Sequence, residues 1–159
     1  MRSLSIDLGD KRTGLALGDS ITGIASPAGV LEIPIDRAAG RELLDALAAK
    51  AGDELGPADR LVLGLPLNMD GSEGPRAKLV RGFAAKLAAR TGRAVVLVDE
   101  RKTSQAADER MARSGLTHGQ KKARRDAIAA AEILRALLED PGTEIDTVRA
   151  DAAEPDSGA

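Results

Sequence analysis

The segment Ser5–Gly14 constrains the fold of this chain more than any other stretch. In Leu4–Leu8, apolar and polar residues alternate, which is the period of a β-strand with one apolar face. Asp7 lies near the end of this strand, Gly9 and Gly14 enclose a short charged turn, and a second extended run follows. The pattern predicts a carboxylate held at the tip of a hairpin, where it either works on a phosphate or metal ion or is simply solvated.

The composition restricts what such a site can be. The chain has 159 residues, enough for one domain with a buried core, and it has neither a signal-peptide pattern nor an apolar run of membrane-spanning length. It contains no cysteine and one histidine, which excludes disulfides, cysteine-based metal sites and histidine-rich zinc sites. We therefore expect a cytoplasmic protein without membrane contact, whose metal ligands, if any, are oxygen atoms.

The order of strand-like and helical patterns predicts an α/β fold. Two nearly continuous apolar runs, Arg60–Leu65 and Ala94–Val98, have the composition of strands buried on both faces. Further strands are expected in Leu4–Leu8, Leu15–Asp19 and Gly29–Ile33, and helices in Arg37–Ala51, Gly74–Thr91, Thr103–Ser114 and Thr117–Glu139. These elements predict a mixed sheet flanked by helices within one domain, residues 1–142. Residues 143–159 are predicted to be an acidic, disordered tail.

The charge of the chain is unevenly distributed. The net charge is −2, but residues 140–159 carry six acids against one arginine, so that residues 1–139 carry +3. Residues 101–125 hold eight basic and two acidic side chains, and residues 76–93 hold six basic and no acidic ones. A basic body predicts contacts with the phosphate backbone of a nucleic acid, and an acidic tail would compete with them.

Two strands end in acidic residues. Asp7 ends the first predicted strand, and Asp99 and Glu100 end the last one. Ligands of such sheets gather at the carboxyl ends of strands, so these side chains are expected to converge. A few carboxylates together suit Mg²⁺ or Mn²⁺, and a site of this kind suits the hydrolysis of phosphodiester bonds.

A third acid, Asp126, lies on the apolar side of the last predicted helix. At 100° per residue it shares a stripe with Ala130, Ile133 and Leu137, while Glu132, Arg135 and Glu139 lie opposite. An acid on an apolar stripe is costly without a partner or a metal ion. We expect Asp126 to face the sheet and join the strand-end acids; the alternative is a pair with Arg125 or Lys122 at the helix edge.

Four segments form a recognisable series along residues 3–139: Ile6–Gly14, Gly64–Ser72, Val98–Thr103 and Arg125–Ala130. Together they resemble the YqgF/RuvX family, which comprises Holliday-junction resolvases of the ribonuclease H-like superfamily that are also assigned to processing of precursor small-subunit rRNA. The resemblance implies a five-stranded mixed sheet, a nuclease that depends on Mg²⁺ or Mn²⁺, and Asp7, Glu100 and Asp126 as the catalytic, metal-binding acids. Asp99 would point to the other face of its strand and ranks second.

Two positions depart from the related patterns. Ala129 and Ala130 stand where resolvases of the RuvC type tend to carry a further helix carboxylate, so only three acids remain to hold metal ions. Lys102 stands where the family often has an apolar or aromatic residue, which removes a stacking contact. Phe83, the single aromatic residue, is assigned to a core stripe with Leu79 and Leu87. Base stacking on aromatic side chains is therefore not expected to be a main device of recognition.

Basic residues near the predicted acids are the candidates for nucleic-acid contacts. They are Lys11, Arg12, Arg101, Lys121, Lys122, Arg124 and Arg125. For Lys11 and Arg12 the alternative is a solvated turn charge. His118 and Thr103 are interpreted as helix-start residues, and Asn68–Ser72 as a loop that could line the cleft.

Other functions remain open at this point. The spacing of Asp7, Gly9 and Gly14 also resembles the first phosphate loop of actin-like and sugar-kinase folds, although those proteins usually need a duplicated pair of domains. A nucleotide-binding or phosphotransferase module is therefore the first alternative, and an rRNA-binding factor with weak catalysis is the second. A resolvase makes two symmetric cuts and should be a homodimer, whereas rRNA trimming needs one site.

Overall fold

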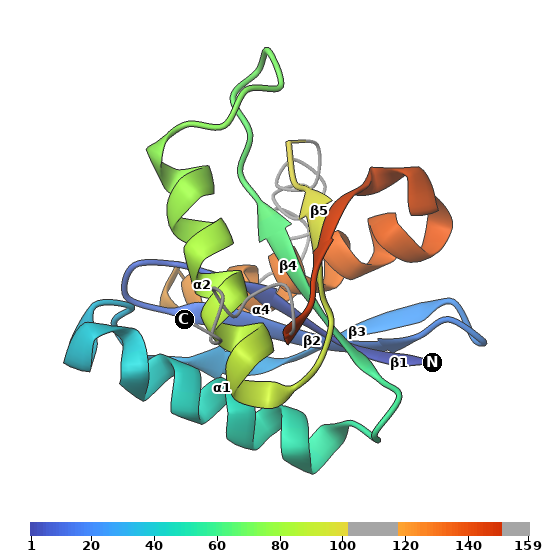
Figure 1. The fold of residues 1–159 in the computed structure, drawn as a ribbon, viewed down its shortest axis with the longest axis horizontal. Helices are drawn as coiled ribbons and strands as arrows, with labels where there is room; N and C mark the ends of the chain where they lie inside the picture. Colours follow the sequence, from blue (N-terminus) through green and yellow to red (C-terminus); the bar gives the residue numbers. More distant parts are fainter. Residues whose placement is uncertain (102–117, 151–159) are drawn as a thin grey trace, which may run out of the picture.

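The computed structural model describes residues 1–101 and 118–150, with the side chains of residues 118–123 left aside. A mixed sheet is covered by helices on both faces (Figure 1). The strands are β1 (Arg2–Asp7), β2 (Thr13–Asp19), β3 (Ile24–Leu31), β4 (Arg60–Leu65), β5 (Val95–Asp99) and β6 (Glu144–Val148). The helices are α1 (Arg41–Glu54), α2 (Pro75–Thr91) and α4 (His118–Glu139), with 3-10 turns η1 (Arg37–Gly40) and η2 (Pro141–Thr143).

The sheet of the described residues has six strands in the order β3-β2-β1-β4-β5-β6. Strands β1, β4 and β5 are parallel neighbours in the centre, while β2, β3 and β6 pair antiparallel at the sides. The predicted α/β class, a mixed sheet flanked by helices, is confirmed. The expected count of five strands is one too few, because β6 adds a strand along the edge of β5.

Apolar side chains on both faces of the central strands explain the three layers. One face of β1, β4 and β5 packs against α1 and α2, and the core there includes Leu4, Ile6, Leu61, Leu63, Leu97, Leu47 and Leu87. The other face packs against α4, through Val62, Val96, Val98, Ile133 and Leu134. Strands β4 and β5 contribute to both cores, as their continuous apolar runs predicted.

Helix boundaries follow the sequence signals only in part. Helix α2 ends before Gly92, whose φ of 69° is the left-handed conformation expected of a C-terminal glycine. Helix α1 begins only after η1 and continues past the predicted end at Ala51, through Gly52 to Glu54. The predicted helix Thr103–Ser114 lies outside the described residues.

Strand β3 is longer and begins earlier than the predicted strand Gly29–Ile33. It covers Ile24–Leu31 and includes Pro27 and Gly29, residues that resemble turn signals in the sequence. Because β3 is an edge strand, a proline without an N–H group can be accommodated there. The pairing of β2 with β3 also shifts register between Leu15 and Ala16.

Strand β6 corrects the predicted tail. Glu144–Val148 pairs with β5 instead of being disordered, and Arg81 of α2 holds it in place. The Arg81 guanidinium donates to Asp146 of β6 at 2.9 Å and to Glu73 at 2.6 and 2.9 Å. The acidic side chains of this strand therefore take part in edge pairing, and residues 151–159 lie outside the described part of the chain.

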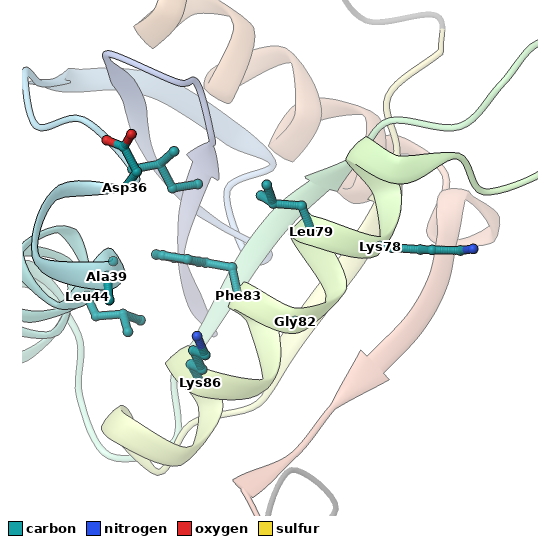
Figure 2. A pocket seen from close by; sticks show the side chains of 10 residues that line it. Asp36, Ala39, Leu44, Lys78, Leu79, Gly82, Phe83 and Lys86 are labelled. Atoms are coloured by element: carbon teal, nitrogen blue, oxygen red, sulfur yellow. The ribbon is translucent and has the colours of Figure 1, made fainter.

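An apolar groove of about 380 Å³ lies between η1 and α2, on the side of the sheet that α1 covers (Figure 2). Phe83 points into it and is 6% exposed, which confirms its assignment to the core. Leu79 is 43% exposed at the same groove, more than expected of a core position. None of the three predicted metal-binding acids lines the groove.

The helices in the described part of the chain include none with the length and apolar composition of a membrane-spanning segment.

Candidate active site

The carboxyl ends of β1, β4 and β5 meet at one edge of the sheet, as parallel neighbours must. Asp7 is the last residue of β1, and Glu100 follows β5 directly. The loop after β4 leads from this edge to the start of α2 (Figure 1). Two predicted acids are thus placed at a common edge by the parallel pairing alone.

Strand parity gives Glu100 and Asp99 different surroundings. Val96 and Val98 belong to the core under α4, so Glu100 continues that face of the strand. Its backbone N–H donates to Leu65 at 3.4 Å, which extends the alignment with β4 by one residue. By the same alternation, Asp99 belongs to the opposite face of the strand.

Gly64 in β4 leaves the space that the Glu100 side chain occupies. A β-carbon at position 64 would overlap Oε2 of Glu100 and would come within 2.6 Å of Cδ1 of Ile133. The carboxylate of Glu100 therefore lies between β4 and α4. Gly64, the first residue of the segment Gly64–Ser72, therefore has a steric role at the site.

Asp126 is held close to β2 by two contacts between the sheet and α4. The hydroxyl of Ser5 donates to the carbonyl of Ala130 at 2.7 Å, one turn further along the helix. At Gly14, a β-carbon would overlap the backbone of Asp126. The predicted apolar stripe is confirmed, because Ala130, Ile133 and Leu137 are buried.

The charges of the three acids interact. The pKa of Asp7 is raised from 3.8 to about 7: burial contributes most, the negative charges of Glu100 and Asp126 add to the shift, and Arg76 opposes it. Burial also raises the pKa of Glu100, with Arg76 opposing the shift and Asp99 adding to it. We call Asp7, Glu100 and Asp126 the acid cluster. Clustered carboxylates with raised pKa values are typical of catalytic and metal-binding sites.

The partner of Asp126 is Arg12, from the turn between β1 and β2. Nε of Arg12 donates to Oδ2 of Asp126 at 2.9 Å, and each side chain is 27% exposed. The sequence suggested Arg125 or Lys122 as the alternative partner, and for Arg12 either a solvated charge or a phosphate contact. The observed pair was not foreseen, because the two residues are far apart in the chain.

Arg76, in the first turn of α2, was not recognised in the sequence. Its guanidinium donates to Asp10 at 2.5 Å and to the carbonyl of Leu8 at 2.9 Å, and its charge acts on Asp7 and Glu100. It belonged to a basic run of residues 76–93 that had no assigned role. Only the packing of α2 beside the β1 end singles it out from the other basic residues of that helix.

Arg101 connects the end of β5 with the loop after β4. It donates from Nε and Nη2 to Asp99, the latter at 2.6 Å, and from Nη1 to the carbonyl of Met69 at 3.3 Å. The loop is itself closed by hydrogen bonds between Asn68 and Ser72, at 2.9 Å between backbone atoms. Arg101 thus has a structural role beside the predicted phosphate contact.

Of the other predicted basic residues, the exposed side chains are those of Lys11, Arg124 and Arg125. Arg124 and Arg125 directly precede Asp126 on α4. The side chains of Lys121, Lys122 and His118 are outside the described atoms, as are residues Lys102 and Thr103.

One polar position of α4 was predicted wrongly. Glu132 is 7% exposed instead of lying on the solvated side of the helix. Its carboxylate accepts from Arg135, and Arg135 also donates to the carbonyl of Ala25 at 3.3 Å. The hairpin of β2 and β3 extends the covered width of α4 beyond the stripe that helical spacing predicts.

Mg²⁺ and Mn²⁺ prefer carboxylate oxygens as ligands, and the acid cluster offers ligands of this type. Within residues 1–101 and 118–150, however, no three acidic or histidine side chains are arranged to hold an ion as they stand. In this arrangement Oδ2 of Asp126 is paired with Nε of Arg12.

A mixed sheet with acids at its carboxyl edge and an acid-bearing helix across one face defines a ribonuclease H-like α/β protein. The solved structure of T. thermophilus RuvC in complex with a Holliday junction substrate has this fold, with a TM-score of 0.51. It is 15% identical and the match covers 91% of this chain and 98% of that one, so the likeness concerns the fold alone.

The RuvX family, described as Holliday junction resolvase, matches residues 1–140. A relative from Anaeromyxobacter sp. (strain K), named "Putative pre-16S rRNA nuclease", is 43% identical over 139 residues, which are 87% of this chain and 97% of the relative. A protein of the same name from Chromobacterium violaceum is 39% identical over 143 residues, 89% of this chain and 100% of the relative. The chain belongs to the RuvX family, as the four sequence segments indicated.

Proposed function

We propose that this protein is a divalent-metal-dependent nuclease that hydrolyses phosphodiester bonds in structured nucleic acid. The observation that carries the proposal is geometric: Asp7 and Glu100 lie at the same edge of the sheet, and the backbone of Asp126 packs against Gly14, the residue paired with Asp7. The names of the family and of its relatives support a nuclease. The alternative of a phosphotransferase accounts less well for Asp126, because an acid on a helix facing the sheet has no role in a phosphate loop.

Each residue of the site has a proposed task. Asp7 and Glu100, fixed at strand ends, and Asp126, fixed on α4, would hold Mg²⁺ or Mn²⁺. Such an ion, when bound, supplies an activated water and stabilises the charge on the leaving oxygen. The exposed Arg124 and Arg125, on the same helix as Asp126, would contact backbone phosphates of the bound nucleic acid.

The test is cleavage of two substrates, a four-way DNA junction and precursor 16S rRNA, with Mg²⁺ or Mn²⁺ and with EDTA as the metal-free control. Asp7→Asn, Glu100→Gln and Asp126→Asn should each reduce the rate by at least about 100-fold, because even outer-shell changes at metal sites cost 10- to 100-fold. Asp53→Asn, an exposed acid of α1, should cleave like the wild type. Full activity of Asp126→Asn would contradict the three-acid site, and full activity of Glu100→Gln would move its role to Asp99.

The two substrates separate the two activities named in the family. Resolution of a junction needs two symmetric cuts, so we expect a two-fold homodimer if junctions are the substrate. Trimming of rRNA needs one active site. The scarcity of aromatic residues favours recognition of shape and phosphates over unpaired bases in either case. Light scattering over a concentration series, together with the cleavage assays, distinguishes the two activities. A monomer that cleaves only RNA would exclude junction resolution and support rRNA trimming.

A further inference from the structure

The ion pair of Arg12 and Asp126 involves one of the three carboxylates of the acid cluster. Nε of Arg12 and Oδ2 of Asp126 are 2.9 Å apart. Gly14, two residues after Arg12, is in steric contact with the backbone of Asp126, so packing of α4 on β2 brings the two side chains together. The pair is therefore a consequence of the same packing that places Asp126 in the cluster.

Arg12 and Arg76 offset the cluster's negative charge in different ways. Arg76 donates to Asp10 and to the carbonyl of Leu8, and acts on Asp7 and Glu100 through its charge. Arg12 donates directly to an oxygen of Asp126. An ion that binds Asp126 has to compete with Arg12 for this carboxylate, whereas Arg76 donates to Asp10 and to the carbonyl of Leu8.

We propose that Arg12 is a positioning residue that exchanges partners: it pairs with Asp126 when no divalent ion is bound and with a backbone phosphate of the nucleic acid when an ion is bound. This inference rests on the proposed function. A guanidinium forms strong, often bidentate hydrogen bonds with phosphate as well as carboxylate, so either partner satisfies it. When Arg12 binds a phosphate, its pair with Asp126 is broken, and the Asp126 carboxylate becomes available to the ion.

The exchange makes ion binding and nucleic-acid binding reinforce each other. Binding free energies are linked reciprocally, so an ion that releases Arg12 must tighten nucleic-acid binding by the same factor as nucleic acid tightens ion binding. A residue with a merely structural role would change stability without changing this factor. The coupling is therefore the decisive quantity.

The first test measures Ca²⁺ binding to the ion-free protein by calorimetry, without nucleic acid. In Arg12→Gln, which keeps a polar side chain without the charge, Ca²⁺ should bind about three- to fivefold tighter, the factor expected for the loss of a partly exposed competing ion pair. Lys11→Gln removes the same charge from the same turn but no pair with Asp126, and should change the affinity by less than about 1.5-fold. Weaker or unchanged binding in Arg12→Gln, or an equal gain in both variants, would overturn the proposal.

The second test measures the anisotropy of a fluorescein-labelled four-way junction with and without Ca²⁺, with gels confirming that the junction stays intact. Ca²⁺ should tighten wild-type binding about tenfold, within the range of typical coupling. In Arg12→Gln the tightening should be smaller by at least about threefold. Arg90→Gln, which changes a residue paired with Asp45 near the other end of α2, should retain it. Melting curves by circular dichroism establish that each variant is folded. Wild-type coupling in folded Arg12→Gln would overturn the exchange.

Failure of the proposed function would have a different signature. If the wild type binds no ion and cleaves neither substrate with Mn²⁺, the proposed function and this inference are both overturned. If the wild type cleaves and binds an ion while Arg12→Gln matches it in affinity and coupling, the inference alone is overturned and the nuclease stands.

Discussion

Gly14 of β2 and Asp126 of α4 are in such close contact that a β-carbon on Gly14 would overlap the carbonyl oxygen and carbon of Asp126. Gly14 is also the residue paired with Asp7 in the antiparallel ladder of β1 and β2. One glycine therefore sets the distance between two acids of the cluster, with Asp7 beside it in the sheet and Asp126 across from it on the helix.

The first prediction concerns this contact. Gly14→Ala should lower the free energy of unfolding by about 1–3 kcal/mol, because backbone atoms of α4 cannot yield like a flexible side chain. It should also reduce cleavage at least about tenfold, since any shift of α4 moves Asp126 away from Asp7. Urea unfolding and cleavage of the four-way junction measure the two effects.

Gly82→Ala is the matched control for Gly14→Ala. Gly82 lies inside α2, and a β-carbon there would meet nothing within 4 Å. Alanine at this position should stabilise the protein by about 0.5–1 kcal/mol, since glycine is unfavourable in a helix interior. If Gly14→Ala were as stable and active as Gly82→Ala, the close approach of β2 and α4 would not determine the site.

The second prediction concerns Gly64 and Glu100. Gly64→Ala should displace the Glu100 carboxylate and reduce cleavage about as much as Glu100→Gln, because both remove the same carboxylate from its place. The double variant should then be little worse than either single variant, since residues in contact show non-additive effects. Multiplied losses in the double variant would mean that the two residues act independently.

Sequence patterns predicted the parts of the fold that local periodicity and hydrophobicity determine. The bounds of β4 were predicted as observed, and so was the end of α2 at Thr91. The pattern also placed Asp126 on the buried stripe, because helical spacing alone determines which side chains share a face. Asp7 and Glu100 could be expected at one edge, because parallel strands end together.

The remaining errors arose where tertiary contacts overrule local signals. Glu132 is buried because the hairpin of β2 and β3 covers its side of α4, which spacing along one helix cannot show. Packing of segments that are distant in the chain brings Arg12 to Asp126, and Arg76 to Asp10 and Leu8 beside the acid cluster. Strand β6 is mostly polar, so no hydrophobic pattern identifies it in the sequence. Its place in the sheet depends on pairing with β5 and on the contact of Asp146 with Arg81.

The third prediction concerns salt dependence. Replacing Arg124 and Arg125 together by Ala should weaken binding of a four-way junction and reduce the slope of log affinity against log salt by up to about 0.9 for each lost phosphate contact. Fluorescence anisotropy from 50 to 200 mM salt, a range in which phosphate contacts dominate the change in affinity, measures the slope. Arg90→Ala is the control, since Arg90 lies near the other end of α2 and pairs with Asp45 at 2.7 Å. An unchanged slope in the double variant would place the binding face elsewhere.

The fourth prediction concerns pH and the stability of the ion-free protein. The pKa of Asp7 is raised from 3.8 to about 7, so between these values the folded protein holds a proton that the unfolded chain has released. The free energy of unfolding should therefore fall as the pH rises from about 4 to about 7. Three pKa units correspond to at most about 4 kcal/mol, and because Asp7 is only partly buried we expect about 1–3 kcal/mol.

Urea unfolding in EDTA at pH 5 and pH 8 measures this effect as the difference between the wild type and Asp7→Asn. Relative to the wild type, the free energy of unfolding of Asp7→Asn should rise by about 1–3 kcal/mol from pH 5 to pH 8, because the variant has no carboxylate to ionise at this position. Asp70→Asn is the matched control: the hydrogen bonds from Ser72 lower the pKa of that exposed carboxyl, so it should follow the wild type across this range. Saturating Mn²⁺ should reverse the order at pH 8, because an ion bound to the ionised Asp7 stabilises the folded wild type and not the variant. If Asp7→Asn were the less stable protein in EDTA at pH 8, the carboxylate would be stabilising the fold by itself, and the charge repulsion inferred within the acid cluster would be wrong.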